Sequence, residues 1–180
     1  MAILNVEKDI RLPVLLMDEF TSDFYDIRTK RFLKSDTNYL DYTIRLEGDF
    51  KKRYGSWLVH MNAFLDAVPA DVPVYILWIP HQAQVNDYYY ENMKKLGAMF
   101  NSKTAIQQYD YPFFSEATKD LSGYRNVKHL NPLTFFQTKD SLNSRLYFVN
   151  DPHINYRGNL MLSTYLKGYI PLKTDTNHLN

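Results

Sequence analysis

The stretch that decides the fold spans residues 146–158 and reads LYFVNDPHINYRG. Its first residues form an apolar run of strand length, and apolar residues at helical spacing follow from residue 158 onward. Asp151 and His153 therefore lie on a loop between a predicted strand and a predicted helix. In open α/β sheets, the loops at the carboxyl ends of strands usually carry the chemistry.

The predicted helix after this loop is amphipathic. Its apolar face is formed by residues at helical spacing, namely Gly158, Met161, Leu162, Tyr165, Leu166 and Tyr169. Asn155 is placed to cap its N-terminus, and Pro171 follows its end. A glycine on this apolar face indicates that the helix packs closely against the sheet.

Further strands and helices alternate along the rest of the chain. Apolar runs typical of strands occupy residues 13–17, 74–79, 104–109 and 145–149. Helical patterns occupy residues 39–46, 57–68, 86–100 and 132–137, and an irregular stretch is predicted from residue 111 to residue 131. This alternation predicts a single α/β domain over residues 1–180 with a mostly parallel sheet.

The composition narrows the classes of function. The chain has 180 residues, 45% of them hydrophobic, which is sufficient for a core, and its formal net charge is +1. The near-neutral charge gives no argument for nucleic acid as a partner. Cysteine is absent, which excludes disulfides, thiol catalysis and cysteine-bound metals. The chain has no signal-peptide pattern and no apolar run of about 20 residues, so it is predicted to be soluble, without a membrane span, in an undetermined compartment.

Asp151 and His153 are the residues best suited to catalysis. A carboxylate bonded to one ring nitrogen of a histidine holds the imidazole in one tautomer and stabilises the imidazolium that forms when it acts as a base. One residue separates the two, so both side chains can point the same way, and Pro152 restricts the loop between them. The alternative is a structural role, because Asp-Pro pairs are common at turns and Asp151 could cap one.

The surroundings of this pair resemble the last conserved block of the SGNH, or GDSL-type, hydrolases. That block has a hydrophobic strand, then Asp-x-His or Asp-x-x-His, then Asn/Ser-x-x-Gly at the start of the final helix, and residues 146–159 are similar to it. The one-residue spacing resembles bacterial carbohydrate esterases and alginate-type acetyltransferases. Residues 74–84 look like the family's inner strand and its Pro-containing loop, and residues 15–26 look like the strand and loop of its Asn-Asp block.

The resemblance implies a three-layer α/β/α domain of flavodoxin-like type and a Ser-His-Asp triad. His153 would be the general base and Asp151 the acid that orients it. Ser22 and Asp23 stand in the place of the family's Asn-Asp pair, so Ser22 would donate to the oxyanion as a shorter and weaker donor than asparagine.

The nucleophile implied by the family is missing from this chain. No Gly-Asp-Ser occurs, and Gly48 and Asp49 are followed by Phe50. We expect that the chain is the C-terminal two-thirds of a longer protein, without the first strand and the nucleophile; the alternative is a natural degenerate form. Either way, the chain alone is predicted to be a poor or inactive hydrolase. A sheet without its first strand exposes an edge, so we expect a homo-oligomer or a compensating N-terminal segment to cover it.

Other candidate residues have weaker support. His81 follows the strand predicted at residues 74–79 and lies at the expected active edge of the sheet, where it could contact substrate or be a polar loop residue. A metal site built from His81, Asp151 and His153 lacks a close-spaced ligand motif, so no metal and no cofactor are predicted. Ser56 and Ser115 lack the strand–turn–helix context that activates a serine nucleophile.

Two functions follow from these observations. The first, implied by the resemblance, is an ester hydrolase or O-acyl (acetyl) transferase acting on a small-molecule or carbohydrate ester. The second is a non-catalytic module on the same fold that binds a glycan or a protein. Its binding surface would use the aromatic residues Tyr88, Tyr89, Tyr90, Tyr109, Tyr111, Phe113 and Phe114.

Overall fold

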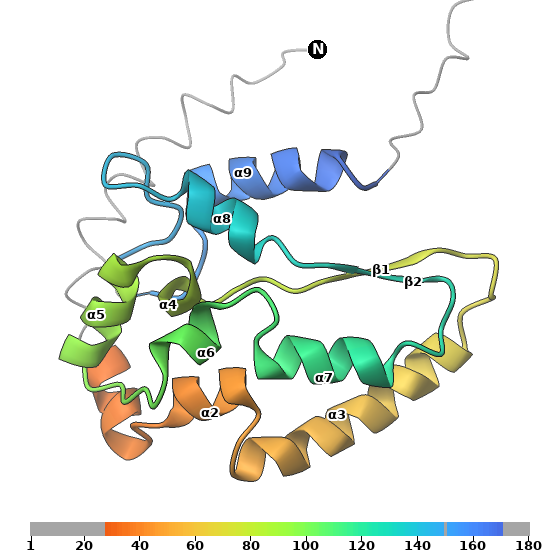
Figure 1. Cartoon of the computed structure of the whole chain (residues 1–180), viewed down its shortest axis with the longest axis horizontal. Coiled ribbons are helices and arrows are strands. Elements are labelled where there is room, and N and C mark those ends of the chain that lie inside the picture. Colours follow the sequence, from red (N-terminus) through yellow and green to blue (C-terminus); the bar gives the residue numbers. More distant parts are fainter. Residues whose placement is uncertain (1–27, 150, 171–180) are drawn as a thin grey trace, which may run out of the picture.

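The computed structural model describes residues 28–149 and 151–170, in which helices predominate (Figure 1). Residues 28–35 are helical. The elements that follow are α2 (Tyr39–Arg45), α3 (Asp49–Asp66), β1 (Val74–Leu77), α4 (Gln82–Val85), α5 (Asp87–Lys95), α6 (Lys103–Gln107), α7 (Pro112–Asp120), β2 (Val127–Leu130), α8 (Leu133–Lys139) and α9 (Tyr156–Lys167). The predicted strand at residues 13–17 lies outside the described residues, as do Ser22 and Asp23.

The described strands β1 and β2 form a small parallel sheet. Val74 is in register with Val127 at one end, and Leu77 with Leu130 at the other. Helices α8 and α9 lie on one side of this strand pair, and α3 and α7 lie on the other (Figure 1). The combination of helices with a parallel strand pair agrees with the α/β class predicted from the sequence.

Several predicted elements are confirmed. β1 falls within the run at residues 74–79, and α3 covers most of the helix predicted at residues 57–68 but begins earlier, at Asp49, and ends at Asp66. α2, α5 and α8 match the helical patterns near residues 39–46, 86–100 and 132–137, although α5 ends at Lys95. α9 begins after Asn155, as expected, because the Asn155 side chain accepts a hydrogen bond from the backbone N–H of Gly158.

Three predictions made from local patterns are wrong. Residues 104–109 do not form a strand, because α6 occupies this region: the Ser102 hydroxyl caps it through the Ala105 N–H (3.2 Å), and Ile106 is buried. The stretch predicted to be irregular contains α7 and β2. Residues 145–149 do not join the sheet, because Tyr147 instead forms an isolated antiparallel bridge with Ile154.

The short helix α4 is central to the packing, since it contacts α5, α6 and α8. Glutamine side chains join these helices through backbone carbonyls. Gln84 donates to the Ile106 carbonyl (3.0 Å), and Gln137 donates to the carbonyls of Gln84 (2.9 Å) and Gln107 (2.8 Å). Buried backbone acceptors are thereby satisfied where the helices are too short to satisfy them internally.

The core around these helices is rich in aromatic side chains. One cluster buries four large aromatic side chains: Trp78 directly after β1, Tyr89 in α5, Phe136 in α8 and Tyr147 before α9. Tyr147 packs edge-on against both Tyr89 and Phe136, with ring centroids 5.6 and 6.1 Å away. The segment that precedes α9 is therefore anchored in the hydrophobic core.

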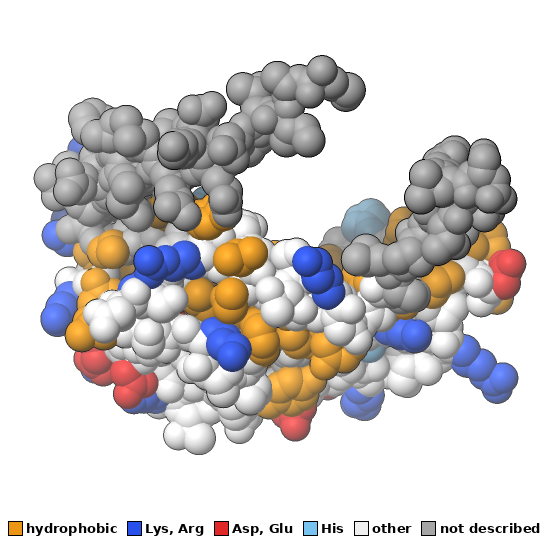
Figure 2. Space-filling view, turned by 90° about the horizontal axis from the view of Figure 1, so that it is seen from above, with side chains coloured by type: hydrophobic (Ala, Val, Ile, Leu, Met, Phe, Trp, Pro, Cys, Tyr) orange, Lys and Arg blue, Asp and Glu red, His pale blue; other side chains and the backbone are white. Residues whose placement is uncertain are grey.

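The surface of the described part carries scattered charge. Figure 2 shows Lys and Arg side chains spread over one face rather than gathered into a patch. None of the helices in residues 28–149 and 151–170 combines the length and hydropathy that crossing a bilayer requires.

Candidate active site

Residues 145–149 and 151–155 lie side by side as the two limbs of a hairpin that carries the predicted catalytic pair; we call these two limbs the 145–155 hairpin. The backbone N–H of Phe148 donates to the His153 carbonyl (3.2 Å), and the N–H of Asn155 donates to the Leu146 carbonyl (2.9 Å). Asp151 lies in the tip between these two limbs. The hairpin, rather than the end of a sheet strand, therefore positions the pair.

Asp151 and His153 are brought together as the sequence predicts. One carboxylate oxygen of Asp151, Oδ1, accepts the backbone N–H of His153 at 2.9 Å and also contacts its ring nitrogen Nδ1. Asp151 is buried, with 5% of its surface exposed, whereas 77% of the His153 side chain is accessible. The pair therefore consists of an acid that is shielded from water and an imidazole that is exposed to water.

This geometry suits general acid–base chemistry. A hydrogen bond from Nδ1–H to the Asp151 carboxylate makes Nε2 the free acceptor of the neutral ring. The carboxylate also opposes the positive charge that appears when Nε2 takes up a proton. The pair can thus accept a proton from a bound hydroxyl group or water and return it to a leaving group.

No serine of the described residues is hydrogen-bonded to His153. Ser115 lies in α7, and its hydroxyl donates to the Asp110 carbonyl (3.1 Å). Ser56 lies exposed in α3. Gly48 and Asp49 form the start of α3, which is not a nucleophile turn. Neither serine is therefore placed as a nucleophile by its contacts.

His81 is part of a helix cap. Its Nδ1 accepts the backbone N–H of Ala83 (3.2 Å), and its own N–H donates to Oε1 of Gln84 (2.9 Å), which together form a reciprocal capping box at the start of α4. Burial lowers the pKa of His81 to about 4. His81 is therefore a neutral hydrogen-bond acceptor in the fold, and its contact with a substrate stays a prediction.

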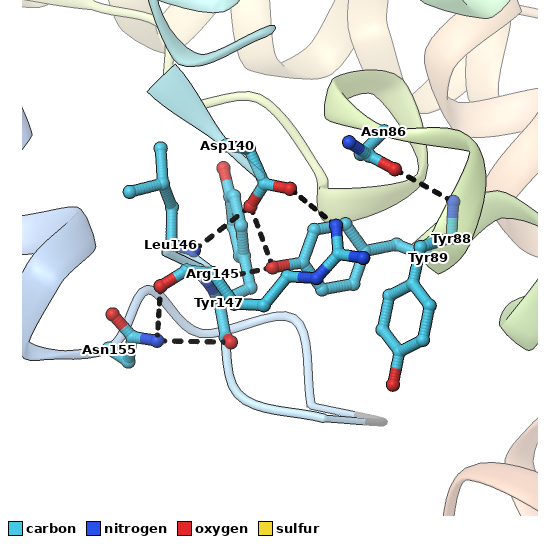
Figure 3. Close-up of polar contacts among 8 residues, drawn as sticks. All are labelled: Asn86, Tyr88, Tyr89, Asp140, Arg145, Leu146, Tyr147 and Asn155. Atoms are coloured by element: carbon cyan, nitrogen blue, oxygen red, sulfur yellow. Dashed lines mark hydrogen bonds and ion pairs between the residues drawn. The ribbon is translucent and has the colours of Figure 1, made fainter. Parts of the chain in front are cut away.

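Asp140 is a polar residue of the interior that sequence patterns did not indicate (Figure 3). Its side chain is fully buried, and its carboxylate accepts hydrogen bonds from Arg145 Nη1 (2.7 Å), the Tyr89 hydroxyl (2.8 Å) and the backbone N–H of Leu146 (2.9 Å). The guanidinium of Arg145 also lies over the rings of Tyr88 (4.1 Å) and Tyr89 (5.4 Å). Asp140 thus ties α5 to the first limb of the hairpin.

Asn155 closes the hairpin from the other side, as Figure 3 also shows. Its side-chain amide donates to the carbonyls of Arg145 (2.9 Å) and Tyr147 (3.1 Å), while its Oδ1 accepts the N–H of Gly158 (3.0 Å). The sequence predicted only the last of these bonds. One residue therefore caps α9 and joins the two limbs of the hairpin that carries the catalytic pair.

The aromatic residues considered as a binding platform lie mainly in the core. Tyr89, Tyr90, Tyr111 and Phe114 are buried, whereas Tyr88 and Tyr109 are exposed. A groove of about 380 Å³ follows α9 instead, and its described lining consists of Asn159, Leu162, Ser163, Leu166, Lys167 and Ile170. Within residues 28–149 and 151–170, no group of three His, Asp or Glu side chains is arranged to hold a metal ion.

The chain was compared with protein-family models, curated proteins and solved structures. No family model, no curated protein and no solved structure matches it. The functional conclusion therefore depends on the geometry of the Asp151–His153 pair and its hairpin.

Proposed function

We propose that the protein catalyses acyl transfer, as an ester hydrolase or O-acyltransferase, with His153 as the general base and Asp151 as its orienting acid. One observation carries the proposal: a buried carboxylate contacts Nδ1 of an imidazole whose side chain is 77% exposed. The same carboxylate oxygen also accepts the backbone N–H of His153 (2.9 Å), so Asp151 caps the turn as well. Its contact with the exposed ring is the additional feature, and it is the one that a general base needs.

In the proposed step, Nε2 of His153 removes the proton of an attacking hydroxyl group while its oxygen bonds to the ester carbonyl carbon. The tetrahedral intermediate then collapses, the bond to the alcohol breaks, and the imidazolium returns its proton to the departing oxygen. The hydroxyl group belongs to water, to an acceptor alcohol or to a serine. Ser22 and Asp23 are proposed to line the oxyanion side, as the resemblance to SGNH hydrolases implies.

The finer parts of the proposal also come from that resemblance. They are a three-layer α/β/α arrangement of the SGNH type and a carbohydrate ester, such as an acetylated sugar, as substrate. The parallel pairing of β1 with β2, and helices on both sides of the pair, support this arrangement (Figure 1).

A kinetic comparison of two histidine variants tests the proposal. We expect slow hydrolysis of p-nitrophenyl acetate by the native chain, and a fall in kcat/KM of about 100-fold or more in His153→Ala. His60→Ala is the matched control, because His60 is also an exposed histidine, in α3, and could react with the ester only as an unspecific surface imidazole. We expect His60→Ala to keep the rate of the native chain. Equal rates for the native chain and His153→Ala would remove His153 from catalysis.

A fluorophosphonate probe identifies the nucleophile in the same samples. Covalent labelling of one serine, lost in His153→Ala and retained in His60→Ala, would assign a serine mechanism. Hydrolysis that depends on His153 but leaves no label would assign water or an external acceptor as the attacking group.

The second candidate function is a non-catalytic binding module, favoured by the absence of a serine bonded to His153 in the described residues and by the apolar groove along α9. A glycan array probed with the native chain tests it. Binding that survives His153→Ala but is lost in Leu166→Asp, a substitution in the groove, would favour this function over acyl transfer.

A further inference from the structure

Asp140 and Tyr89 lie outside the catalytic pair, yet both hold the hairpin that carries it. We infer that they are positioning residues, which act through the backbone of the 145–155 hairpin to set the geometry of Asp151 and His153. The inference rests on the proposed function, since positioning matters for catalysis only if His153 acts as a base. Its test is nevertheless chosen to be independent of turnover.

The first limb of the hairpin is held by side chains from other elements. The backbone N–H of Leu146 donates to Oδ2 of Asp140 (2.9 Å), and the N–H of Tyr147 donates to the hydroxyl of Tyr89 (3.2 Å). Two successive amide groups are thus bonded to side chains of other elements rather than to a neighbouring strand. Their acceptors decide where this limb lies relative to α5 and α8.

The Tyr89 hydroxyl has one direction of hydrogen bonding. It donates to Asp140 Oδ2 at 2.8 Å, which leaves its oxygen free to accept the N–H of Tyr147. Burial, followed by the nearby Asp140 charge, raises the pKa of Tyr89, so the hydroxyl keeps its proton and this donor–acceptor direction is preserved. Arg145 balances the Asp140 charge from the opposite carboxylate oxygen.

The anchored first limb is connected to the catalytic pair by hydrogen bonds of the hairpin. Asn155 and the Tyr147 hydroxyl, which donates to the Pro80 carbonyl (2.6 Å), fix the remaining groups of this limb. From the fixed Tyr147, one residue leads to the Phe148–His153 hydrogen bond, which closes the tip that carries Asp151. We therefore expect a shift of the first limb to reach the contact between Asp151 and His153 through this hydrogen bond.

A matched pair of tyrosine variants separates positioning from general stability. Tyr89→Phe removes only the hydroxyl that joins Asp140 to Tyr147. Tyr54→Phe removes a comparable bond elsewhere, because the Tyr54 hydroxyl donates to Oδ2 of Asp120 (2.7 Å) between α3 and α7. Both tyrosines are buried and bonded to an aspartate, and both substitutions are isosteric, so both variants should fold.

The readout is the tautomer of His153, measured from the ¹⁵N chemical shifts of its ring by NMR. We expect the native chain and Tyr54→Phe to keep a single tautomer with the proton on Nδ1. In Tyr89→Phe we expect a mixture of tautomers, and about a 10-fold lower kcat with an unchanged KM if the chain hydrolyses esters.

Two outcomes would overturn the inference: an unchanged His153 tautomer in Tyr89→Phe, or equal changes in both variants, which would indicate general loosening. A native Nδ1–H tautomer lost only in Tyr89→Phe, together with ester hydrolysis that does not depend on His153, would instead support the positioning role and contradict the proposed catalytic function. Failure of the positioning role and failure of the proposed catalytic function therefore give different results.

Discussion

Gly158 shows how one residue decides how closely α9 approaches the catalytic hairpin. A Cβ atom at this position would lie 2.2 Å from the Leu146 carbonyl oxygen and 3.0 Å from Cβ of Ile154. Both neighbours belong to the 145–155 hairpin. The sequence predicted close packing at Gly158, and the close approach is confirmed, although the partner is this hairpin rather than a strand of the sheet.

Replacing Gly158 by alanine is therefore expected to destabilise the protein. The methyl group overlaps a backbone oxygen that has no freedom to rotate away, so we expect Gly158→Ala to lower the free energy of unfolding by about 2 to 3 kcal/mol. Gly55→Ala is the control, because nothing lies within 4 Å of a Cβ at Gly55 in the middle of α3. There, alanine should stabilise by about 0.5 to 1 kcal/mol. Urea unfolding measures both, and an unaffected Gly158→Ala would contradict the packing.

At the scale of elements, the N-terminus of α9 and the hairpin before it behave as one unit. The side chain of Asn155 makes three hydrogen bonds, one to the helix and two to the first limb of the hairpin. α5 begins at another asparagine cap, where the Asn86 side chain accepts the N–H of Tyr88 (2.9 Å). Both helices therefore begin at an asparagine cap, but within the described residues only the Asn155 side chain also bonds to the backbone of a neighbouring segment.

This difference predicts unequal costs for the same substitution. Asn86→Ala removes a helix cap and should cost about 1 kcal/mol. Asn155→Ala removes a cap and leaves two backbone carbonyls without their donor, so we expect a cost of about 2 to 4 kcal/mol. Thermal and urea unfolding of both variants provide the comparison. Equal costs would mean that Asn155 acts only as a cap and does not secure the hairpin.

At the scale of the whole molecule, two histidines make hydrogen bonds that only the neutral ring can make in this arrangement. Nδ1 of His81 accepts the Ala83 N–H, and Nδ1 of His129 accepts the indole N–H of Trp78 (3.1 Å). Burial lowers the pKa of both, to about 4 for His81. In the unfolded chain, histidine binds a proton near pH 6.5. Between these values the unfolded state holds more protons than the folded state.

We therefore expect stability to be full above pH 6.5 and to fall as the pH drops toward about 4. The contribution of His81 to this loss is on the order of 2 kcal/mol. In His81→Asn, asparagine still caps α4 but does not titrate, so the pH dependence should be shallower. Urea unfolding from pH 7.5 to 4.5 measures this, and identical slopes for both proteins would contradict it. The expected homo-oligomer, a further property of the whole molecule, stays a prediction.

Local periodicity predicted those parts of the fold whose cause is local. The amphipathic helices α3 and α9 were predicted from the spacing of their apolar residues, because burial of one face imposes that spacing. β1 was predicted from a continuous apolar run rich in β-branched and aromatic residues. α6 and β2 were not predicted. α6 has five residues, too few for a periodic signal, and its conformation depends on the Ser102 cap. β2 reads VKHL, which lacks the continuous apolar run of β1, and its conformation depends on pairing with β1.

The sequence by itself determined the pairing of Asp151 with His153 and the cap at Asn155, because these contacts join residues only two or three positions apart. Only the tertiary structure decided what holds that pair in place. Tyr89 is 51 residues from Asp140 and 58 from Tyr147, and no local pattern records a contact over such separations. The physical reason is burial: once the core removes Asp140 and the hairpin amides from water, each must find its partner inside the protein.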